Sequence, residues 1–204
     1  MLDVILGAVT TLIAYFLGTI PSGLLVARLR GVNIQQVGSG NIGATNVLRA
    51  LGVVPAVIVV ILDPLKGAIA TLIPSLLGIG PWGVALAGLA VVLGNSFNIL
   101  LRLRGGKGIA TSIGVFLVID PLVALMCIVL GVFTILVSRY VSLGSLVGMV
   151  ALPLFIIVSA TWAWPELLLA AALAALAIYR HRDNIRRLLA GEERRLGEKF
   201  AARH

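Results

Sequence analysis

The sequence predicts an all-α integral membrane protein with about seven transmembrane helices, some of them short. Of its 204 residues, 60% are hydrophobic and 12% are charged, and the mean hydropathy is +1.11, which lies outside the range of soluble domains. Apolar runs follow one another along the chain, and most are long enough to cross a hydrocarbon layer of ~30 Å. The charges lie in the short gaps between these runs. We expect one polytopic domain, residues 1–204, that ends in a basic tail at 180–204.

The apolar runs predict where the spans lie. In chain order they are 4–27, 52–78, 82–101, two short helices within 109–137, then 143–160 and 167–179. The run 109–137 is too long for one span, and Asp120 and Pro121 near its middle favour a turn. The short spans would pack against neighbours where the membrane is thinned. The first run carries Asp3 and has neither a basic leader nor a small-residue cleavage site, so we expect a retained span rather than a signal peptide.

The distribution of charge predicts the orientation. Seven spans place the termini on opposite sides, and basic loops mark the cytoplasmic side, so we expect the N-terminus outside and the C-terminus in the cytoplasm. The formal net charge is +8, but because these charges lie in membrane loops we expect no nucleic-acid partner. The expected inner segments hold Arg28, Arg30, Arg49, Arg102, Arg104, Lys107, Arg139 and the basic tail; the outer ones hold Asp3, Asp120 and Glu166, with Trp162 and Trp164 as interfacial anchors.

Three residues inside the apolar runs need separate explanations. Cys127 is the only cysteine, so there is no disulfide or cysteine-based metal site, and we expect it to serve packing. Asp63 and Lys66 share one face of a helix and can neutralise each other in lipid. We favour a structural ion pair that faces the helix bundle, and a catalytic pair is the alternative.

The segment 101–114 places a glycine-rich turn between two apolar runs. Gly105, Gly106 and Gly108 could turn backbone N–H groups toward one point, next to the N-terminus of the following helix and the charge of Lys107. Such a concavity attracts phosphate. The alternative is a plain membrane turn whose basic residues only mark the cytoplasmic side. The spacing is not that of a P-loop.

The segment 38–49 offers a second anion site between the first two spans. Gly40 and its neighbouring glycines allow close approach of backbone amides, Ser39 and Thr45 supply hydroxyls, and Arg49 supplies a bidentate donor. The alternative is a flexible polar loop that ends in a helix cap.

The segment 179–193 is the third polar cluster. If it is helical, His181 and Asn184 lie on one stripe and face the bundle together, while the arginines around them form a solvated face near anionic headgroups. His204 is terminal, and we assign it no role. All three clusters fall on the predicted inner face, a pattern typical of a site for one or two phosphorylated ligands.

Taken together, the clusters resemble the three motifs of the acyl-phosphate-dependent glycerol-3-phosphate acyltransferases of bacteria. The resemblance runs essentially end to end and includes the Asp63 and Lys66 pair. One position departs from the family: after Gly94 the family usually has histidine, and this chain has Asn95. The motif residues are Gly-Thr-Ile-Pro-Ser-Gly at 18–23, Gly-Ser-Gly-Asn-Ile-Gly-Ala-Thr-Asn-Val-Leu-Arg at 38–49, Arg-Gly-Gly-Lys-Gly-Ile-Ala-Thr-Ser at 104–112, Ser142 and Ser145, and the segment from His181 to Glu193.

The resemblance implies transfer of a fatty acyl group from acyl phosphate to the first hydroxyl of glycerol 3-phosphate, giving lysophosphatidic acid and phosphate. The partners would be these two substrates and membrane lipid, with no cofactor and no metal, in a monomer of the bacterial inner membrane whose site faces the cytoplasm. The implied catalytic residues are Ser39, Arg49, Lys107 and His181. The implied substrate-binding residues are Gly40, Asn41, Thr45, Gly105, Gly106, Gly108, Ser142, Ser145, Asn184 and Glu193, of which Glu193 would orient the basic tail or pair with an arginine in it.

Two questions stay open at this level. An acyl phosphate carries a good leaving group, so no covalent acyl-enzyme is required, and either His181 or the departing phosphate could take the proton; we favour the phosphate. The second question is whether the chain is instead a transporter of a phosphorylated metabolite, which would use similar glycine loops and short helices.

We do not expect acyl-CoA as the donor. A different family of acyltransferases uses acyl-CoA and carries a His-x-x-x-x-Asp signature, but the fourth and fifth residues after His181 are Ile185 and Arg186, so the aspartate is missing.

Overall fold

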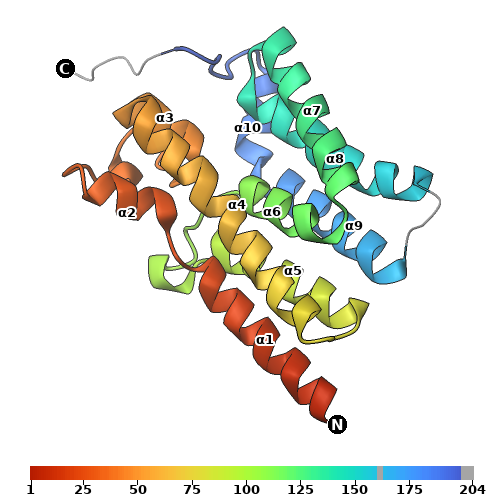
Figure 1. The fold of residues 1–204 in the computed structure, drawn as a ribbon. Helices are drawn as coiled ribbons and strands as arrows, with labels where there is room; N and C mark the ends of the chain where they lie inside the picture. The colour runs from red at the N-terminus through yellow and green to blue at the C-terminus, as the bar shows by residue number, and fades with distance from the viewer. Residues whose placement is uncertain (160–162, 199–204) are drawn as a thin grey trace.

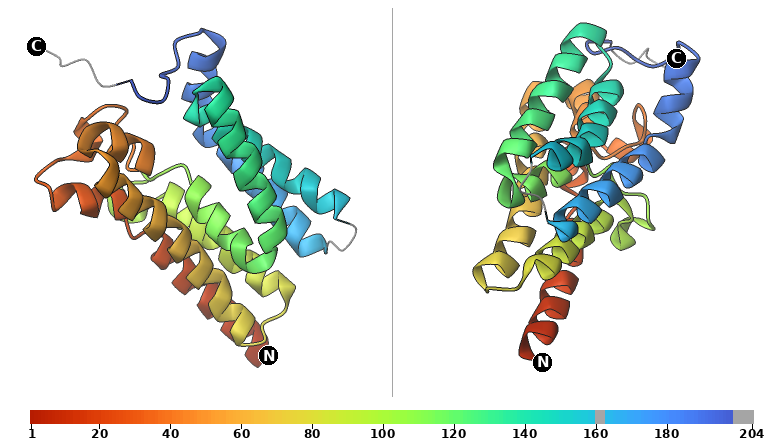
Figure 2. Two further views of the ribbon diagram at one scale, coloured as in Figure 1. Left: turned by 45° about the horizontal axis from the view of Figure 1, so that its top comes forward. Right: turned by 90° about the vertical axis from the view of Figure 1, so that its right-hand side faces the viewer.

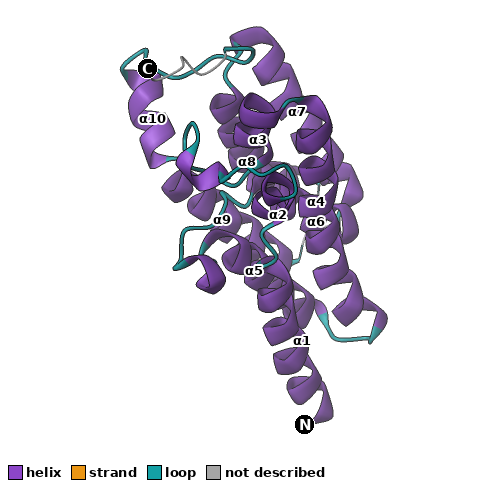
Figure 3. Cartoon of the chain, turned by 90° about the vertical axis from the view of Figure 1, so that its left-hand side faces the viewer, coloured by secondary structure: helices purple, strands orange, loops and turns teal. Residues whose placement is uncertain are grey.

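The computed structural model describes residues 1–159 and 163–198, and over these residues it is helical and has no strand. Trp162, His204 and the rest of the tail beyond 198 lie outside the described residues. Short loops connect the helices (Figure 3). The elements are α1 Leu2–Gly18, α2 Ser22–Arg28, η1 Ile34–Gln36, α3 Ala44–Leu51, α4 Val53–Leu76, α5 Pro81–Ser96, η2 Ile99–Leu101, α6 Ile109–Ile119, α7 Pro121–Ser138, α8 Val141–Val158, α9 Trp164–Arg180 and α10 Arg182–Leu189.

Over the described residues, helices occupy each segment predicted to span the membrane, and five helical segments are long and apolar enough to do so. These five are Leu2–Arg28, Val53–Leu76, Pro81–Leu101, Pro121–Ser138 and Val141–Val158. Helix α6 is a shorter apolar helix, and α9 has 17 residues. The full count of seven spans and the orientation of the termini remain predictions.

The helices form two groups with α6 between them. Helices α1, α4 and α5 pack together, and α8 packs on both α7 and α9; the two groups meet where α9 packs on α5 and where α6 contacts both α4 and α7 (Figures 1 and 2). Helices α3 and α10 lie toward the end of the molecule away from the N-terminus (Figure 1). Polar segments from both ends of the chain therefore reach the same end of the bundle.

Within the predicted first span, residues 4–27, the chain breaks between α1 and α2, a break that hydropathy did not predict. Pro21 has no N–H, and the break frees two carbonyl oxygens. Asn98 Nδ2 donates to the oxygen of Thr19 at 2.7 Å, and Lys66 Nζ donates to the oxygen of Ile20 at 3.2 Å. A helix break inside a membrane protein is stable only with such internal partners.

The predicted break within 109–137 is confirmed. Helix α6 ends at Ile119 and α7 begins at Pro121, while the Asp120 side chain accepts a hydrogen bond from Val123 N at 3.0 Å. Asp120 is therefore the N-cap of α7.

Close packing of α4 on α6 fixes where α6 begins. A Cβ on Gly67 would lie 2.2 Å from the Thr111 carbonyl oxygen, and one on Gly114 would lie 1.9 Å from that of Pro64. Only glycine allows the two backbones to approach so closely. This contact holds the N-terminal turn of α6 against α4.

Candidate active site

The loop before α6 is held on both sides. Gly106 N donates to the Asn95 carbonyl oxygen at 2.9 Å, while Arg180 donates to the carbonyl oxygens of Gly106 at 3.1 Å and Gly105 at 2.9 Å. A Cβ on Gly105 would lie 2.0 Å from the Asn95 carbonyl oxygen. The loop is thus a fixed structure in which glycine is required by contact with α5.

This geometry corrects one sequence prediction. The N–H of Gly106 was expected to face a phosphate together with those of Gly105 and Gly108, but it is already bonded to Asn95. The roles of the Gly105 and Gly108 amides remain predictions. Gly108 has φ +81° as the N-cap of α6, a conformation that favours glycine.

Lys107 joins this loop to the third polar cluster. Its Nζ donates to Asn184 Oδ1 at 2.5 Å. Burial is the main reason that the pKa of Lys107 falls from 10.5 to about 8, although the carboxylate of Glu193 raises it. Lys107 is therefore largely a cation at neutral pH. Three arginine charges also lower its pKa: Arg187, Arg180 and Arg49.

Glu193 connects three segments near Lys107. Its carboxylate accepts hydrogen bonds from Ser142 at 2.8 Å, Asn184 at 2.6 Å and Arg187 at 2.7 Å. Burial alone would raise its pKa, but these hydrogen bonds outweigh it and lower the pKa. Because Asn184 Nδ2 donates to Glu193, its amide oxygen is the atom that faces Lys107. The predicted pairing of Glu193 with an arginine of the tail is confirmed by Arg187.

His181 lies at the junction of α9 and α10 with 2% of its surface exposed. Its Nδ1 lies 2.8 Å from the Ala177 carbonyl oxygen, which can only accept, so Nδ1 carries the proton and Nε2 is the basic nitrogen. Burial and then the charge of Lys107 lower the pKa of His181 to about 4. The ring is neutral at physiological pH. His181 and Asn184 are both buried, as their shared stripe predicts.

The second cluster is organised by Asn46, a residue that the sequence did not single out. Its Nδ2 donates to the carbonyl oxygens of Val37 at 3.0 Å and Asn41 at 2.9 Å, and its Oδ1 accepts from Ser39 N at 3.2 Å. The Asn41 side chain in turn accepts from Gly43 N at 2.8 Å. An amide in the first turn of a helix next to a polar loop is the sequence signal that could have identified Asn46.

The C-terminal segment 192–198 connects this cluster with the rest of the site. Arg49 Nη2 donates to the Arg194 carbonyl oxygen at 3.3 Å, so α3 contacts the tail. Leu196 N donates to the Arg139 carbonyl oxygen at 2.6 Å, and Arg139 Nη2 donates back to Leu196 O at 3.2 Å. The segment therefore runs between α3 and the turn from α7 to α8.

Ser145 lies on the wall of an apolar cavity between α6, α7 and α8. The cavity has a volume of about 110 Å³, and Val132 on its outer wall is 47% exposed. Its lining residues are Ile109, Ile113, Cys127, Ile128, Gly131, Val132, Ile135, Gly144, Ser145, Gly148 and Met149.

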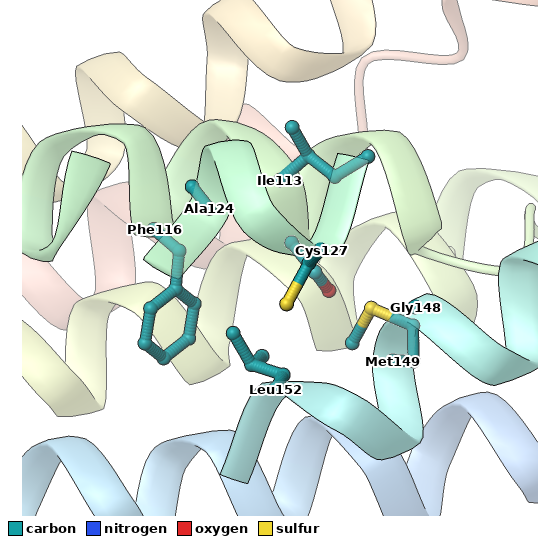
Figure 4. Close-up of a pocket in the computed structure, with 8 residues that line it drawn as sticks. Ile113, Phe116, Ala124, Cys127, Gly148, Met149 and Leu152 are labelled. Atoms are coloured by element: carbon teal, nitrogen blue, oxygen red, sulfur yellow. The ribbon is translucent and has the colours of Figure 1, made fainter. Parts of the chain in front are cut away.

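A smaller cavity of about 10 Å³ lies beside it and shares Ile113, Cys127, Gly148 and Met149 with it. Phe116 and Leu152 close this inner space, and the Cys127 side chain lies among these apolar groups (Figure 4). Cys127 is buried, and its surroundings agree with the packing role predicted for it.

The structure thus brings several of the predicted residues together. Ser142, Asn184 and Glu193 form a hydrogen-bonded network with Lys107, and the charge of Lys107 helps to lower the pKa of His181. Ser39, Gly40, Asn41 and Thr45 lie in the loop and first turn before Arg49, and their contact with a substrate remains a prediction. The sequence missed the hydrogen bonds of Asn95 and Arg180, since neither lies near its loop partners along the chain.

Such a site can bind anions at the end of an apolar bundle. It combines the partly buried ammonium of Lys107, several guanidinium groups and the side-chain amide of Asn184 beside a cavity suited to hydrocarbon. Within residues 1–159 and 163–198, the His, Cys, Asp and Glu side chains form no group of three that could hold a metal ion.

Comparison with known proteins gives a consistent result. A family model described as glycerol-3-phosphate acyltransferase matches residues 8–191. The glycerol-3-phosphate acyltransferase of Thermus thermophilus is 46% identical over 194 residues, covering 95% of this chain and 97% of the relative. Glycerol-3-phosphate acyltransferase 1 of Deinococcus radiodurans is 45% identical over 192 residues, with 93% and 96% covered.

Two solved structures are similar over nearly the whole chain. The crystal structure of PlsY, an integral membrane glycerol 3-phosphate acyltransferase, in its glycerol 3-phosphate form matches with a TM-score of 0.89 at 43% identity, covering 94% of this chain and 96% of that one. Its lysophosphatidic acid form matches with a TM-score of 0.88 at 42% identity, covering 94% and 95%.

Proposed function

The chain belongs to the glycerol-3-phosphate acyltransferase family, and from this premise we propose that it transfers a fatty acyl group from acyl phosphate to the sn-1 hydroxyl of glycerol 3-phosphate. The products are lysophosphatidic acid and inorganic phosphate. The similar PlsY structures in glycerol 3-phosphate and lysophosphatidic acid forms support this acceptor and this product. The observation that carries the proposal is the contact of Lys107 with Asn184, which joins two phosphate-binding candidates into one site.

The cations of the site have two phosphates to neutralise. Lys107 and the N-terminal turn of α6 suit the phosphate of the donor, since a helix N-terminus and an ammonium both favour negative charge. Arg49, His181 and Asn184 suit glycerol 3-phosphate, and the family resemblance assigns these three residues and Ser145 to it. As the bond to the leaving phosphate breaks, charge grows on its oxygens, and a fixed ammonium beside it lowers the barrier.

The transfer needs no nucleophile from the protein. The acceptor hydroxyl attacks the carbonyl carbon of the acyl phosphate, the new ester bond forms, and the bond from that carbon to the phosphate oxygen breaks. The hydroxyl proton leaves with the phosphate, so atoms and charge balance. The pKa of about 4 for His181 makes its Nε2 a weak base, which supports the phosphate as proton acceptor and leaves the imidazole to orient the hydroxyl.

The apolar cavity beside Ser145 suits the fatty chain of the donor. It lies between α6, α7 and α8 and directly adjoins the N-terminal turn of α6 through Ile109. Val132 is half-exposed on its lipid side, so an amphipathic donor could enter laterally from the membrane. Hydrocarbon in this cavity would place the acyl phosphate near the polar end of the bundle.

The protein is a multi-pass membrane protein, and the bacterial inner membrane with a cytoplasmic site is the location we propose. The basic residues of the loops and tail support this orientation. The substrates are phosphorylated and polar, so a site at the cytoplasmic surface can receive them from water. We further propose that the monomer is active, since the network around Glu193 is complete within one chain.

Purified protein in detergent provides the test. With acyl phosphate and glycerol 3-phosphate together it should form lysophosphatidic acid and phosphate in equal amounts, and with acyl-CoA in place of acyl phosphate it should form none. Product from acyl-CoA alone would overturn the proposed donor. Counterflow of glycerol 3-phosphate in liposomes without release of phosphate would favour a transporter.

A further inference from the structure

Lys66 is buried in the bundle with all three of its ammonium protons in use. It is 5% exposed and pairs with Asp63 at 2.8 Å. It also donates to Asn95 Oδ1 at 2.7 Å and to the Ile20 carbonyl oxygen at 3.2 Å. Because an ammonium has three donors, Lys66 has none left for a substrate. Its position nevertheless links α4 to the start of α2 and to the end of α5.

Asn95 carries this link to the glycine loop. Its side chain accepts from Lys66, and its backbone carbonyl accepts from Gly106 N. Its amide nitrogen lies 3.0 Å from where a Cβ on Gly106 would be. The residue directly after Gly106 is Lys107. A shift of Asn95 would therefore move the ammonium that contacts Asn184.

We propose that Asn95, held by Lys66, is a positioning residue for Lys107, and that the requirement at position 95 is a hydrogen-bond acceptor and not a titratable base. This inference rests on the proposed function, since it concerns how the same site is held. The hydrogen bond from a buried cation fixes the asparagine rotamer. Asp63 neutralises the charge of Lys66, so Lys66 can hold Asn95 without leaving an unpaired charge in the bundle.

The shape of the Asn95 side chain shows which substitutions at this position keep a hydrogen-bond acceptor for Lys66 and which remove it. Histidine Nδ1 is bonded to Cγ, as asparagine Oδ1 is, so it can present an acceptor to Lys66 from a similar place. Leucine has the branched shape of asparagine without an acceptor. Serine keeps a polar group that is too short to reach Lys66.

The test compares Asn95→His, Asn95→Leu and Asn95→Ser with the unaltered protein. We expect Asn95→Leu and Asn95→Ser to raise the KM for glycerol 3-phosphate or lower kcat by roughly tenfold or more, the loss typical of a hydrogen bond to a charged group. The alkaline limb of the activity profile should also move, because the surroundings of Lys107 change. Asn95→His should instead keep KM and kcat within about threefold of the values of the unaltered protein, a change smaller than the loss of one typical hydrogen bond causes. Its alkaline limb should stay where it is in the unaltered protein.

Asp120→Ala is the matched control for stability. It removes the N-cap of α7 at the far end of α6, so it should lower the unfolding temperature without changing KM or the alkaline limb. If Asn95→Leu does not fold, Asn95→Ser and Asn95→His still decide the question. Normal kinetics in folded Asn95→Ser, or failure of folded Asn95→His to restore activity, would overturn the inference. Absence of product from the unaltered protein would instead overturn the proposed function.

Discussion

Lys107 Nζ lies 2.5 Å from Asn184 Oδ1, although the two residues belong to segments at opposite ends of the second half of the chain. The orientation of Asn184 is set by Glu193, which accepts a hydrogen bond from its Nδ2. The contact therefore joins the loop before α6 to helix α10 at Lys107.

Lys107→Ala should reduce kcat by roughly 100-fold or more, the loss typical of removing one electrostatic contact to a transition state. The variant should still insert in the membrane, because Lys107 lies outside the helices. Phosphate release from acyl phosphate and glycerol 3-phosphate measures the effect. Near-normal turnover in this variant would contradict the proposed site.

The pH dependence follows from the pKa of Lys107, which lies at about 8. The ammonium form, which binds phosphate, exists below this value and is lost as pH rises through it. We therefore expect kcat/KM to decline above about pH 8, while the limb in kcat moves to higher pH because bound phosphate stabilises the ammonium. Initial rates from pH 6 to pH 10, about two pH units on either side of the pKa of Lys107, would measure the alkaline limbs of kcat/KM and of kcat. An unchanged alkaline limb in Lys107→Arg would assign it to another group.

His181→Gln should lower kcat by less than roughly 100-fold and leave a pH profile like that of the unaltered protein, because general bases contribute more than orienting groups do. Glutamine retains a hydrogen-bonding group but cannot serve as a base. A large loss of kcat together with a flat pH profile would make His181 the proton acceptor.

Gly106→Ala should raise the KM for glycerol 3-phosphate, and Gly105→Ala should impair folding. The added Cβ at Gly106 would lie 3.0 Å from the side-chain amide of Asn95, which can shift slightly. The added Cβ at Gly105 would lie 2.0 Å from the backbone oxygen of Asn95, which cannot move without α5. Kinetics and thermal unfolding of the two variants would separate these outcomes. Equal effects would mean that the loop is less rigid than the contacts indicate.

Val132→Phe should raise the KM for long-chain acyl phosphate more than that for a short-chain donor, because the larger side chain fills part of the cavity. The KM for glycerol 3-phosphate should not change. Val129→Phe is the control on the same helix, since Val129 is 60% exposed to the surroundings and does not line the cavity. Equal effects of both substitutions would place the fatty chain elsewhere.

Hydropathy and turn residues predicted most of the helical architecture. Asp120 and Pro121 marked a break because both favour helix starts, and the break lies where they indicate. The break at Pro21 was not predicted, because the run 4–27 carries no charged residue and is apolar enough to be taken as one span. The break is stabilised by hydrogen bonds from the side chains of Asn98 and Lys66, which lie far from it along the chain. The periodicity of apolar residues gives no information on such distant partners.

The site was predictable as a set of polar clusters but not as a network. The resemblance identified Lys107 and Asn184, and their contact follows only from the packing of α9 and α10 near the loop. Gly106 was expected to bind phosphate through its N–H, yet α5 already uses that donor. Glycine at 105 therefore reflects close backbone approach to α5, and anion binding by this loop stays a prediction.

Segment 192–198 also has a consequence for how the protein could be inactivated in the cell. It contacts α3 through Arg49 and the turn after α7 through Arg139, and it follows the exposed Gly191. After a proteolytic cut following Gly191, only noncovalent contacts would hold Glu193 beside Asn184, while every membrane helix stayed intact. A water-soluble protease would thus reach the support of Asn184 without entering the bilayer.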